Sequence, residues 1–348
     1  MANELIFTVV FFLIICTLLV FDLGVFNKRD HIISNREAAG WTMLWVFVSF
    51  CWYAFLAVKG ELLHSIDTID KLRFISEKYH QDVNILPDNL QASLAHYRSV
   101  LSMEYLTGYL VEYSLSVDNI FVMILIFSAF GVEKRYYHRV LFWGIIGAVV
   151  FRLIFIFAGA YLISRFGWIL YLFAAFLIFT GVRMFITRNK EEEMDVAKHP
   201  VVKYSSRFFK VSKEFVGNRF FIKQDGVSYI TPLFIVLLII EFTDIIFAVD
   251  SIPAIFAVTK DPYIVFFSNI FAILGLRTLF FLLINVMDKM RFFKHGLSFL
   301  LVFIGVKMII NDWLHENGFN SVQTLLVILA ILGISIISSL LFPEQKEV

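Results

Sequence analysis

Long apolar runs alternate with shorter polar segments along most of this chain of 348 residues. An α-helix needs about 20 mainly apolar residues to cross a bilayer. Runs of roughly this length lie at 4–26, 39–58, 101–130, 137–163, 166–187, 229–259, 263–287, 294–311 and 321–342. The pattern therefore predicts an all-α membrane protein with about nine transmembrane helices.

Two of these runs, 101–130 and 229–259, carry acids in the same arrangement. In each, an acid is followed after five residues by an aspartate and a small polar residue. The two copies read Glu112-Tyr-Ser-Leu-Ser-Val-Asp118-Asn119 and Asp244-Ile-Ile-Phe-Ala-Val-Asp250-Ser251. A charge at the bilayer centre costs roughly 2.5–3.5 kcal/mol on insertion scales, so such acids usually face the bundle interior and mark an ion path.

The similarity between the two halves extends beyond the acids. Arg152 and Arg277 occupy matched positions in the following runs, and Gly181 and Gly305 are matched in the third run of each half. Three helices per copy reverse the orientation of the second copy relative to the first. The chain is therefore predicted to contain two inverted three-helix repeats with a binding site at their interface.

The acid-bearing runs offer a set of oxygen ligands for a cation. The candidates are Glu112, Asp118, Asn119, Glu241, Asp244, Asp250 and Ser251. Carboxylates and carbonyls suit Mn²⁺, Mg²⁺ or Ca²⁺, whereas Zn²⁺ or copper favours the His and Cys that these motifs lack. Close acids in a low dielectric share protons, and an entering cation can displace them. This chemistry supports metal/proton exchange.

Three further residues receive roles beside these acids. Arg152 and Arg277 are predicted counter-charges, with snorkelling to an interface as the alternative. Pro253 removes the donor for the Val249 carbonyl and is predicted to break or kink the second acid-bearing helix. The first has no proline, but Ser114, Ser116 and Asn119 could satisfy an unwound backbone there. Both runs are too long for simple spans, so both helices are predicted to be broken or re-entrant. The competing interpretation of the acids themselves is that they only join helices to one another.

Charge placement orients the predicted helices. Apolar residues make up 59% of the chain and charged residues 17%, against about 25% charged in soluble domains. The net charge of +1 gives no reason to expect a nucleic-acid partner. Basic residues gather at 28–36, 134–139, 188–228 and 289–294. The positive-inside rule then places the N-terminus outside and the C-terminus in the cytoplasm.

These observations divide the chain into six predicted parts. They are two N-terminal helices (1–58), an external segment (59–100), the first repeat (101–187), a basic cytoplasmic insert (188–228), the second repeat (229–312), and a last helix with a short tail (313–348). A turn dipeptide at 225–226 between β-prone runs predicts a hairpin at the end of the insert.

Three stretches resemble the TerC/Alx family of integral membrane proteins. They begin at Glu112, Glu241 and Ser268 and read Glu-Tyr-Ser-Leu-Ser-Val-Asp-Asn, Glu-Phe-Thr-Asp-Ile-Ile-Phe-Ala-Val-Asp-Ser-Ile-Pro and Ser-Asn-Ile-Phe-Ala-Ile-Leu-Gly-Leu-Arg. The resemblance implies a manganese exporter of the bacterial inner membrane, with the seven oxygen-bearing residues as candidate ligands. It also implies a link to the loading of exported metalloproteins.

The leading hypothesis is thus a non-enzymatic exporter of divalent cations, with Mn²⁺ as transported ion and no resident cofactor. Its partners are the cation and the lipid bilayer. One alternative is a membrane assembly factor that loads metal into exported proteins through the 59–100 segment. A remote alternative is an intramembrane aspartyl enzyme with Asp118 and Asp250 as its dyad, although the chain lacks the Gly-x-Gly-Asp motif of that class.

Overall fold

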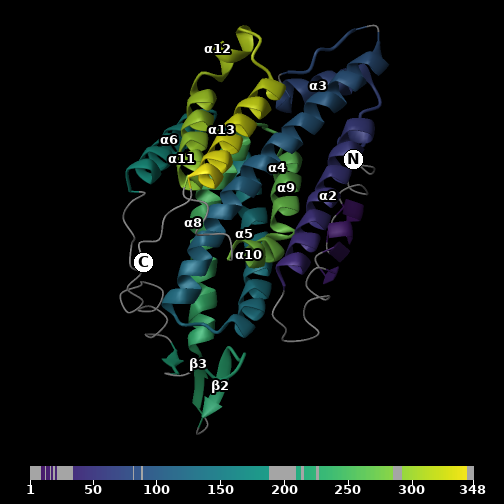
Figure 1. Cartoon of the computed structure of the whole chain (residues 1–348). Coiled ribbons are helices and arrows are strands. Elements are labelled where there is room, and N and C mark those ends of the chain that lie inside the picture. The colour runs from purple at the N-terminus through teal and green to yellow at the C-terminus, as the bar shows by residue number, and fades with distance from the viewer. Residues whose placement is uncertain are drawn as a thin grey trace.

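The computed structural model is a bundle of long helices with a small sheet at one end (Figure 1). It describes residues 9–11, 13–15, 17–18, 20–21, 34–80, 82–87, 89–187, 209–212, 215–224, 227–284 and 292–342. For residues 118, 187, 250 and 315 the description covers the backbone only. The predicted helix at 4–26 and the first part of the basic insert therefore lie largely outside the described residues.

The helices follow the apolar runs of the sequence. They are α2 (Asn35–Lys59), η1 (Gly60–Leu62), α3 (Ile69–Tyr79), α4 (Leu90–Ala129), η2 (Lys134–Tyr136), α5 (Tyr137–Arg165), α6 (Ile169–Thr187), α8 (Pro232–Phe256), α9 (Pro262–Ile273), α10 (Leu276–Leu283), α11 (Phe293–Ile309), α12 (Asn311–Glu316) and α13 (Ser321–Leu341). Side chains cap several of the helix starts. The Ser34 hydroxyl accepts from the Glu37 N–H, and Asn320 and Gln323 form a reciprocal capping box before α13.

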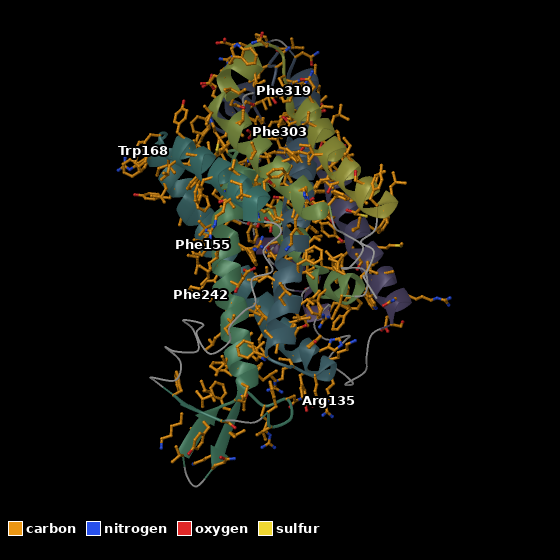
Figure 2. The ribbon with its side chains drawn as sticks, turned by 60° about the vertical axis from the view of Figure 1, so that its left-hand side comes forward. Arg135, Phe155, Trp168, Phe242, Phe303 and Phe319 are labelled. Atoms are coloured by element: carbon orange, nitrogen blue, oxygen red, sulfur yellow. The ribbon has the colours of Figure 1, made fainter. Side chains whose placement is uncertain are left out.

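Among the described residues, six helices are long and apolar enough to cross a membrane, and the count rises to seven spans if the bent pair α9–α10 is one span. The chain is thus an all-α, multi-pass membrane protein. The predicted number of nine is not confirmed, because α11 has only 17 residues and the first run is mostly undescribed. Large apolar side chains such as Trp168 and Phe242 project from the outside of the bundle, as expected of a lipid-facing surface (Figure 2).

The prediction of broken acid-bearing helices is wrong for the described backbone. Helix α4 continues unbroken for 40 residues and α8 for 25. The hydroxyl groups of α4 therefore do not take the place of lost backbone hydrogen bonds. The Ser114 hydroxyl donates to the Leu110 carbonyl at 2.6 Å within an intact helix. Pro253 lies in the last turn of α8, where its missing N–H affects only the final carbonyls before the helix ends.

The break occurs instead in the run at 263–287, between α9 and α10, whose axes differ by 45°. Gly275 takes a left-handed conformation there, with φ of 89°. A Cβ at this position would lie 2.9 Å from atoms of the Trp45 side chain. Both the dihedral angle and the close approach require glycine.

Two hydrophobic clusters fill the bundle, one toward each end. The sheet-end cluster includes Val111 and Ile120 of α4, Val236 and Ile240 of α8, and Phe220 and Ile230 beside the sheet. The α3-end cluster includes Tyr105 and Tyr109 of α4, Ala248 and Ile252 of α8, and Leu72 and Ile75 of α3. Helices α4 and α8 therefore cross the bundle in opposite directions. Glu112 and Asp244 lie where each helix passes from one cluster to the other.

Helices α6 and α11 contact each other through the two matched glycines. A Cβ at Gly181 would lie 2.8 Å from the Ser298 carbonyl oxygen, and one at Gly305 would lie 2.8 Å from the Ala174 carbonyl oxygen. Each glycine thus faces the residue seven positions before the other glycine. Such reciprocal contacts arise when two helices run antiparallel about a local two-fold axis. The contact between α6 and α11 is therefore of the kind expected between the third helices of two inverted repeats. The inverted repeat as a whole stays a prediction.

The polar ends of the bundle differ in structure (Figure 1). Helices α3 and α12 lie at one end, and strands β1 (Lys210–Val211), β2 (Phe221–Gln224) and β3 (Val227–Ile230) lie at the other. The strand order is β1-β3-β2, with β1 parallel and β2 antiparallel to β3. Gln224 pairs with Val227, as in a hairpin closed at 225–226. These two turn residues lie outside the described part of the chain.

Candidate ion-binding site

Glu112 of α4 and Arg152 of α5 form an ion pair in the middle of the bundle, where Arg152 Nη1 donates to Glu112 Oε1. Neither side chain is more than 1% exposed. Both residues lie deep inside the bundle on long, mainly apolar helices. Burial of such charges is tolerable only when they are paired and hydrogen-bonded. Each residue therefore depends on the other to remain inside the bundle.

The same guanidinium group also reaches the second half of the chain. Arg152 Nη1 donates to Asn269 Oδ1 of α9 at 2.8 Å, and its Nη2 lies 3.8 Å from Asp244 Oδ1 of α8. Asn269 and Asp244 are both buried. One arginine thus joins α4, α5, α8 and α9. Its fork of donors is suited to contact several oxygen acceptors at once.

Several carboxyl oxygens of this group have no hydrogen-bond partner within the described residues. They are Glu112 Oε2, both oxygens of Asp244, and Glu241 Oε2. An unsatisfied buried acceptor is costly, and more so when it is charged. Two of these carboxyl groups, Glu112 and Asp244, contact one guanidinium, and Glu241 lies one turn from Asp244, so the group attracts cations. These oxygens supply the ligands that a hard divalent cation needs.

Glu241 lies one turn before Asp244 on α8, and its carboxyl group rests against Gly147 of α5. The Glu241 oxygens occupy the place where a Cβ at position 147 would be. Gly147 therefore provides the space that lets this acid lie between the two helices. The sequence pattern does not single out Gly147, because the reason for glycine there is a contact between helices far apart in sequence.

The other predicted ligands extend from this centre toward both ends. Asn119 follows Glu112 by two helical turns and is flanked by residues of the sheet-end cluster, whereas Ser251 is flanked by residues of the α3-end cluster. Both are buried, and the Asn119 amide nitrogen and Ser251 hydroxyl have no hydrogen-bond partner in the described part of the chain. Seven residues of helix rise by about 10 Å. A single ion cannot contact both residues, so the polar groups mark a path rather than one shell.

Asp118 and Asp250 each precede one of these residues, so their backbones lie on opposite sides of the centre. Their side chains lie outside the described residues, and their assignment as ligands stays a prediction. Arg277 is buried on α10, with 1% of its surface exposed. Its role as a counter-charge is also still a prediction.

Asn269 was not among the predicted ligands. An amide side chain within the apolar run 263–287 is nevertheless a sequence feature from which a polar site could have been predicted.

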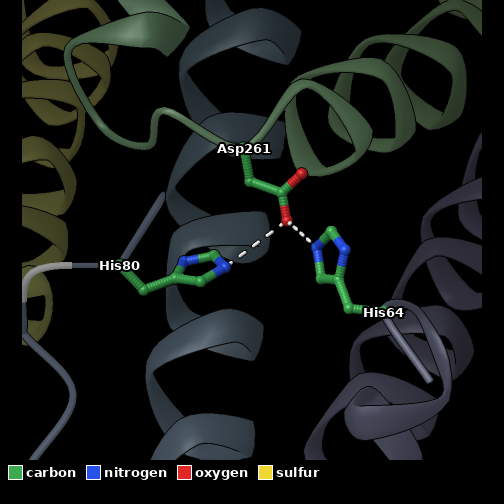
Figure 3. A group of neighbouring side chains, drawn as sticks. All are labelled: His64, His80 and Asp261. Atoms are coloured by element: carbon green, nitrogen blue, oxygen red, sulfur yellow. Dashed lines mark hydrogen bonds and ion pairs between the residues drawn. The ribbon is translucent and has the colours of Figure 1, made fainter. Parts of the chain in front are cut away.

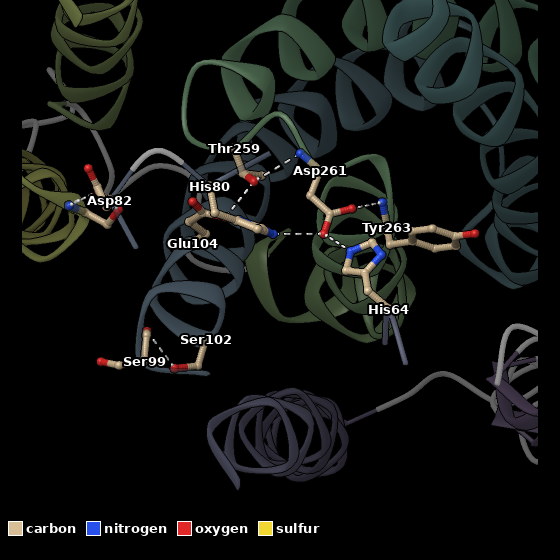
Figure 4. A network of polar contacts seen from close by, with 10 residues as sticks. His64, His80, Asp82, Ser99, Ser102, Glu104, Thr259, Asp261 and Tyr263 are labelled. Carbon is tan, nitrogen blue, oxygen red and sulfur yellow. Dashed lines mark hydrogen bonds and ion pairs between the residues drawn. The ribbon is translucent and has the colours of Figure 1, made fainter. Parts of the chain in front are cut away.

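A second buried polar group lies near the α3 end of the bundle and is called here the histidine cluster: His64, His80 and Asp261 (Figure 3). His64 Nε2 lies 2.8 Å and His80 Nε2 lies 3.4 Å from the same oxygen, Asp261 Oδ2. His80 Nδ1 is hydrogen-bonded to Glu104 Oε2 at 2.8 Å (Figure 4). No sequence motif predicts this cluster, because its members follow η1, α3 and α8 and meet only in the fold.

Electrostatics within the histidine cluster favour the charged forms of His80 and Asp261. Burial opposes a charge on His80, but the carboxylates of Glu104 and Asp261 outweigh it and raise the pKa of His80 to about 10. Burial likewise opposes ionisation of Asp261, yet His64 and His80 hold the pKa of that carboxyl below its usual range. The cluster thus holds a persistent carboxylate between two imidazole rings.

Comparison with known proteins assigns the chain to a family. The integral membrane protein TerC family model matches residues 98–347. An uncharacterised membrane protein of Myxococcus xanthus, STKORF319, is 40% identical over 336 residues, which cover 95% of this chain and 91% of the relative. A protein of Salmonella typhi provisionally named membrane-bound redox modulator Alx is 40% identical over 312 residues, covering 88% and 85%.

The Alx protein of Escherichia coli strain K12, with the same provisional name, is 39% identical over 311 residues, covering 88% of this chain and 86% of the relative. No solved structure matches the chain. A family model that covers most of the chain, together with relatives of similar length, settles the classification. The chain belongs to the TerC family of integral membrane proteins.

Proposed function

We propose that this protein exports a divalent cation, Mn²⁺ foremost, across the bacterial inner membrane in exchange for protons. The observation that carries the proposal is the buried group around Arg152. Carboxyl groups from α4 and α8 share one guanidinium and retain oxygens without hydrogen-bond partners among the described residues. Purely structural ion pairs gain from satisfying all their oxygens, whereas a transient ligand needs oxygens left available.

In this mechanism Arg152 acts as an internal substitute for the cation. Its guanidinium contacts Glu112 and Asp244, and a divalent cation would compete for the same two carboxylates. The arginine then needs a second acceptor when it is displaced, and the Asn269 oxygen at 2.8 Å provides one. Because either the arginine or the cation is bound to the acids, their negative charge is neutralised at every stage.

The polar groups on each side of this centre supply the route. Asn119, with Asp118 beside it, lies on the sheet side of Glu112, and Ser251, with Asp250 beside it, lies on the α3 side of Asp244. A cation moving from the sheet side would meet the first-repeat acids, then the central carboxyl groups, then the second-repeat acids. If the sheet end is cytoplasmic, as the basic loops predict, this direction is export.

Proton exchange follows from the number of acids. Several carboxyl groups in a low dielectric cannot all remain ionised beside a single counter-charge, so some bind protons when no cation is present. A divalent cation that binds to these groups then releases protons. Carboxylate and amide oxygens, without His or Cys, favour a hard cation such as Mn²⁺ over Zn²⁺ or copper.

The redox role in the relatives' name finds little support in the cysteines of this chain. The sequence contains two cysteines, Cys16 and Cys51, which are too far apart to form a Cys-x-x-Cys motif. Cys51 is exposed on α2. The proposal therefore assigns no thiol chemistry and no catalytic residue. Loading of exported metalloproteins remains compatible with export, since both deliver metal to the outer side.

The function can be tested by the metal content of cells. Cells that produce the wild-type protein and are loaded with Mn²⁺ should retain less manganese, measured by mass spectrometry, than cells with an empty vector. Asp244→Asn should abolish this difference while the protein is still inserted in the membrane. Asp70→Asn is the matched control, because Asp70 is exposed at the start of α3, away from the bundle. Equal manganese content with and without the wild-type protein would refute the proposal.

A further inference from the structure

The histidine cluster brings together three segments that are separate in sequence. His64 follows η1, His80 ends the helix α3, and Asp261 caps the start of α9 (Figure 3). His80 and Asp261 side chains are fully buried, and the His64 side chain is 6% exposed. Two imidazoles and one carboxylate that converge in a buried space form a recurrent metal-binding set.

The distances within the cluster suit a tetrahedral ion. Zinc bonds of about 2.0–2.1 Å at tetrahedral angles place neighbouring ligand atoms roughly 3.4 Å apart. His80 Nε2 and Asp261 Oδ2 are 3.4 Å apart, and His64 Nε2 and Asp261 Oδ2 are 2.8 Å apart. All three ligand atoms lie within 4.8 Å of one another. An ion would replace the hydrogen bond between His64 and Asp261, so these two atoms would separate from 2.8 Å toward about 3.4 Å.

The surroundings of His80 point independently to a ligand. Its Nδ1 is held by Glu104 Oε2 at 2.8 Å, and Glu104 is in turn fixed by the Thr259 hydroxyl at 2.6 Å (Figure 4). This arrangement aims the other ring nitrogen, Nε2, at Asp261 and His64. Within the described residues Nε2 is fully buried, and its contact with Asp261 Oδ2 at 3.4 Å falls short of hydrogen-bond geometry. A carboxylate that orients a histidine in this way is the usual support of a metal ligand.

The charge of the cluster is also suitable. Asp261 and Glu104 supply two negative charges, which offset a dication that binds in place of the proton on His80. A cavity of about 190 Å³ is lined by Glu104 and Thr259, the residues that support His80, whereas the three ligands themselves do not line it. A satisfied outer shell is part of what a functional metal site requires.

We propose that His64, His80 and Asp261 bind a divalent transition-metal ion of the Zn²⁺ class, with Glu104 as the supporting residue. This site is distinct from the intramembrane acids and does not depend on the proposed transport. Its imidazole ligands select a softer ion than the oxygen-rich centre. The bound ion links the segment after η1 and the end of α3 to the α8–α9 turn, and so ties His64 and His80 to the bundle.

The test uses the purified full-length protein in detergent. After treatment with a chelator, the protein is equilibrated with Zn²⁺ and the zinc bound per chain is measured by mass spectrometry. His64→Gln and His80→Gln should each lose one zinc per chain relative to wild type. Glu104→Gln should raise the dissociation constant by about 10–100-fold, the usual effect of removing an outer-shell partner. Size-exclusion chromatography confirms that each variant is folded.

Two controls separate this site from others. His96→Gln should keep the zinc, because His96 lies in the same region but accepts only from the Asn84 N–H. Asp244→Asn should also keep it, although it removes an acid of the transport site. Zinc content that is the same in wild type, His64→Gln and Glu104→Gln would overturn the proposal, as would a folded wild-type protein that retains no zinc. If His80→Gln does not fold, His64→Gln and Glu104→Gln decide.

Discussion

Replacement of Gly147 by alanine should separate stability from transport. The Glu241 carboxyl group occupies the place that a Cβ at position 147 would take. That group is the far end of a flexible side chain, so it can move away without shifting a backbone. Gly144 lies one turn earlier on α5, and a Cβ there would meet only Ile240 at 3.5 Å, an ordinary contact. Gly144→Ala is therefore the matched control.

The two variants should agree in stability and differ in ion affinity. An interior Gly→Ala replacement favours a helix by about 0.8–1.0 kcal/mol, so neither variant should unfold at a lower temperature than wild type. In Gly147→Ala the Glu241 carboxyl must leave its position by about an ångström or more. A displacement of this size at a functional group can cost on the order of 100-fold. We expect a 10–100-fold higher KM for Mn²⁺ in Gly147→Ala and an unchanged KM in Gly144→Ala.

The assay is Mn²⁺ uptake into sealed proteoliposomes over a range of Mn²⁺ concentrations, together with thermal unfolding of the same samples in detergent. Combining Gly147→Ala with Glu241→Gln should add no further loss, because both changes act on one carboxyl group. Equal KM values for the two alanine variants would refute the role of Glu241. A clear loss of stability in Gly147→Ala alone would show that Gly147 serves close helix contact instead.

Two other predictions concern the matched positions of the two halves. Gly181→Ala and Gly305→Ala should each destabilise the protein by about 1–3 kcal/mol, since the added Cβ meets a backbone oxygen that cannot move aside. Gly333 has open space around it, so Gly333→Ala should not lower the unfolding temperature. An unchanged unfolding temperature in Gly181→Ala would disprove the α6–α11 contact. Asp118→Asn and Asp250→Asn should each abolish Mn²⁺ transport while leaving the protein inserted, because they lie on opposite sides of the centre and neither can replace the other. Normal transport by either variant would exclude its acid from the path.

The sequence predicts the central residues better than the shapes of the helices that carry them. The matched spacing of Glu112, Asp244 and Arg152 is enough to place them in one buried layer, because apolar helices leave charges no other favourable position. The position of the backbone break could not be predicted in this way. Pro253 was expected to break α8, yet a proline one turn from a helix end removes only a hydrogen bond near that end. The turn at Gly275 depends on its contact with Trp45, which the sequence does not show.

The histidine cluster could not be predicted for a related reason. His64 and His80 lie in a polar segment where histidines are common, and Asp261 resembles an ordinary helix cap before Pro262. Each residue alone has a simple local explanation. Only the fold brings the two rings to the same carboxylate oxygen and shows that one ring nitrogen lacks a hydrogen-bond partner among the described residues.

Simultaneous measurement of Mn²⁺ and proton movement in sealed proteoliposomes, with the membrane potential clamped, tests the central claim most directly. Wild-type protein should move Mn²⁺ in one direction and protons in the other, and both fluxes should disappear in Glu112→Gln and Asp244→Asn. Mn²⁺ flux without proton movement would contradict exchange and leave a uniport or channel-like route. Mn²⁺ flux at the wild-type rate in both variants would contradict the assignment of the path to the carboxyl groups around Arg152.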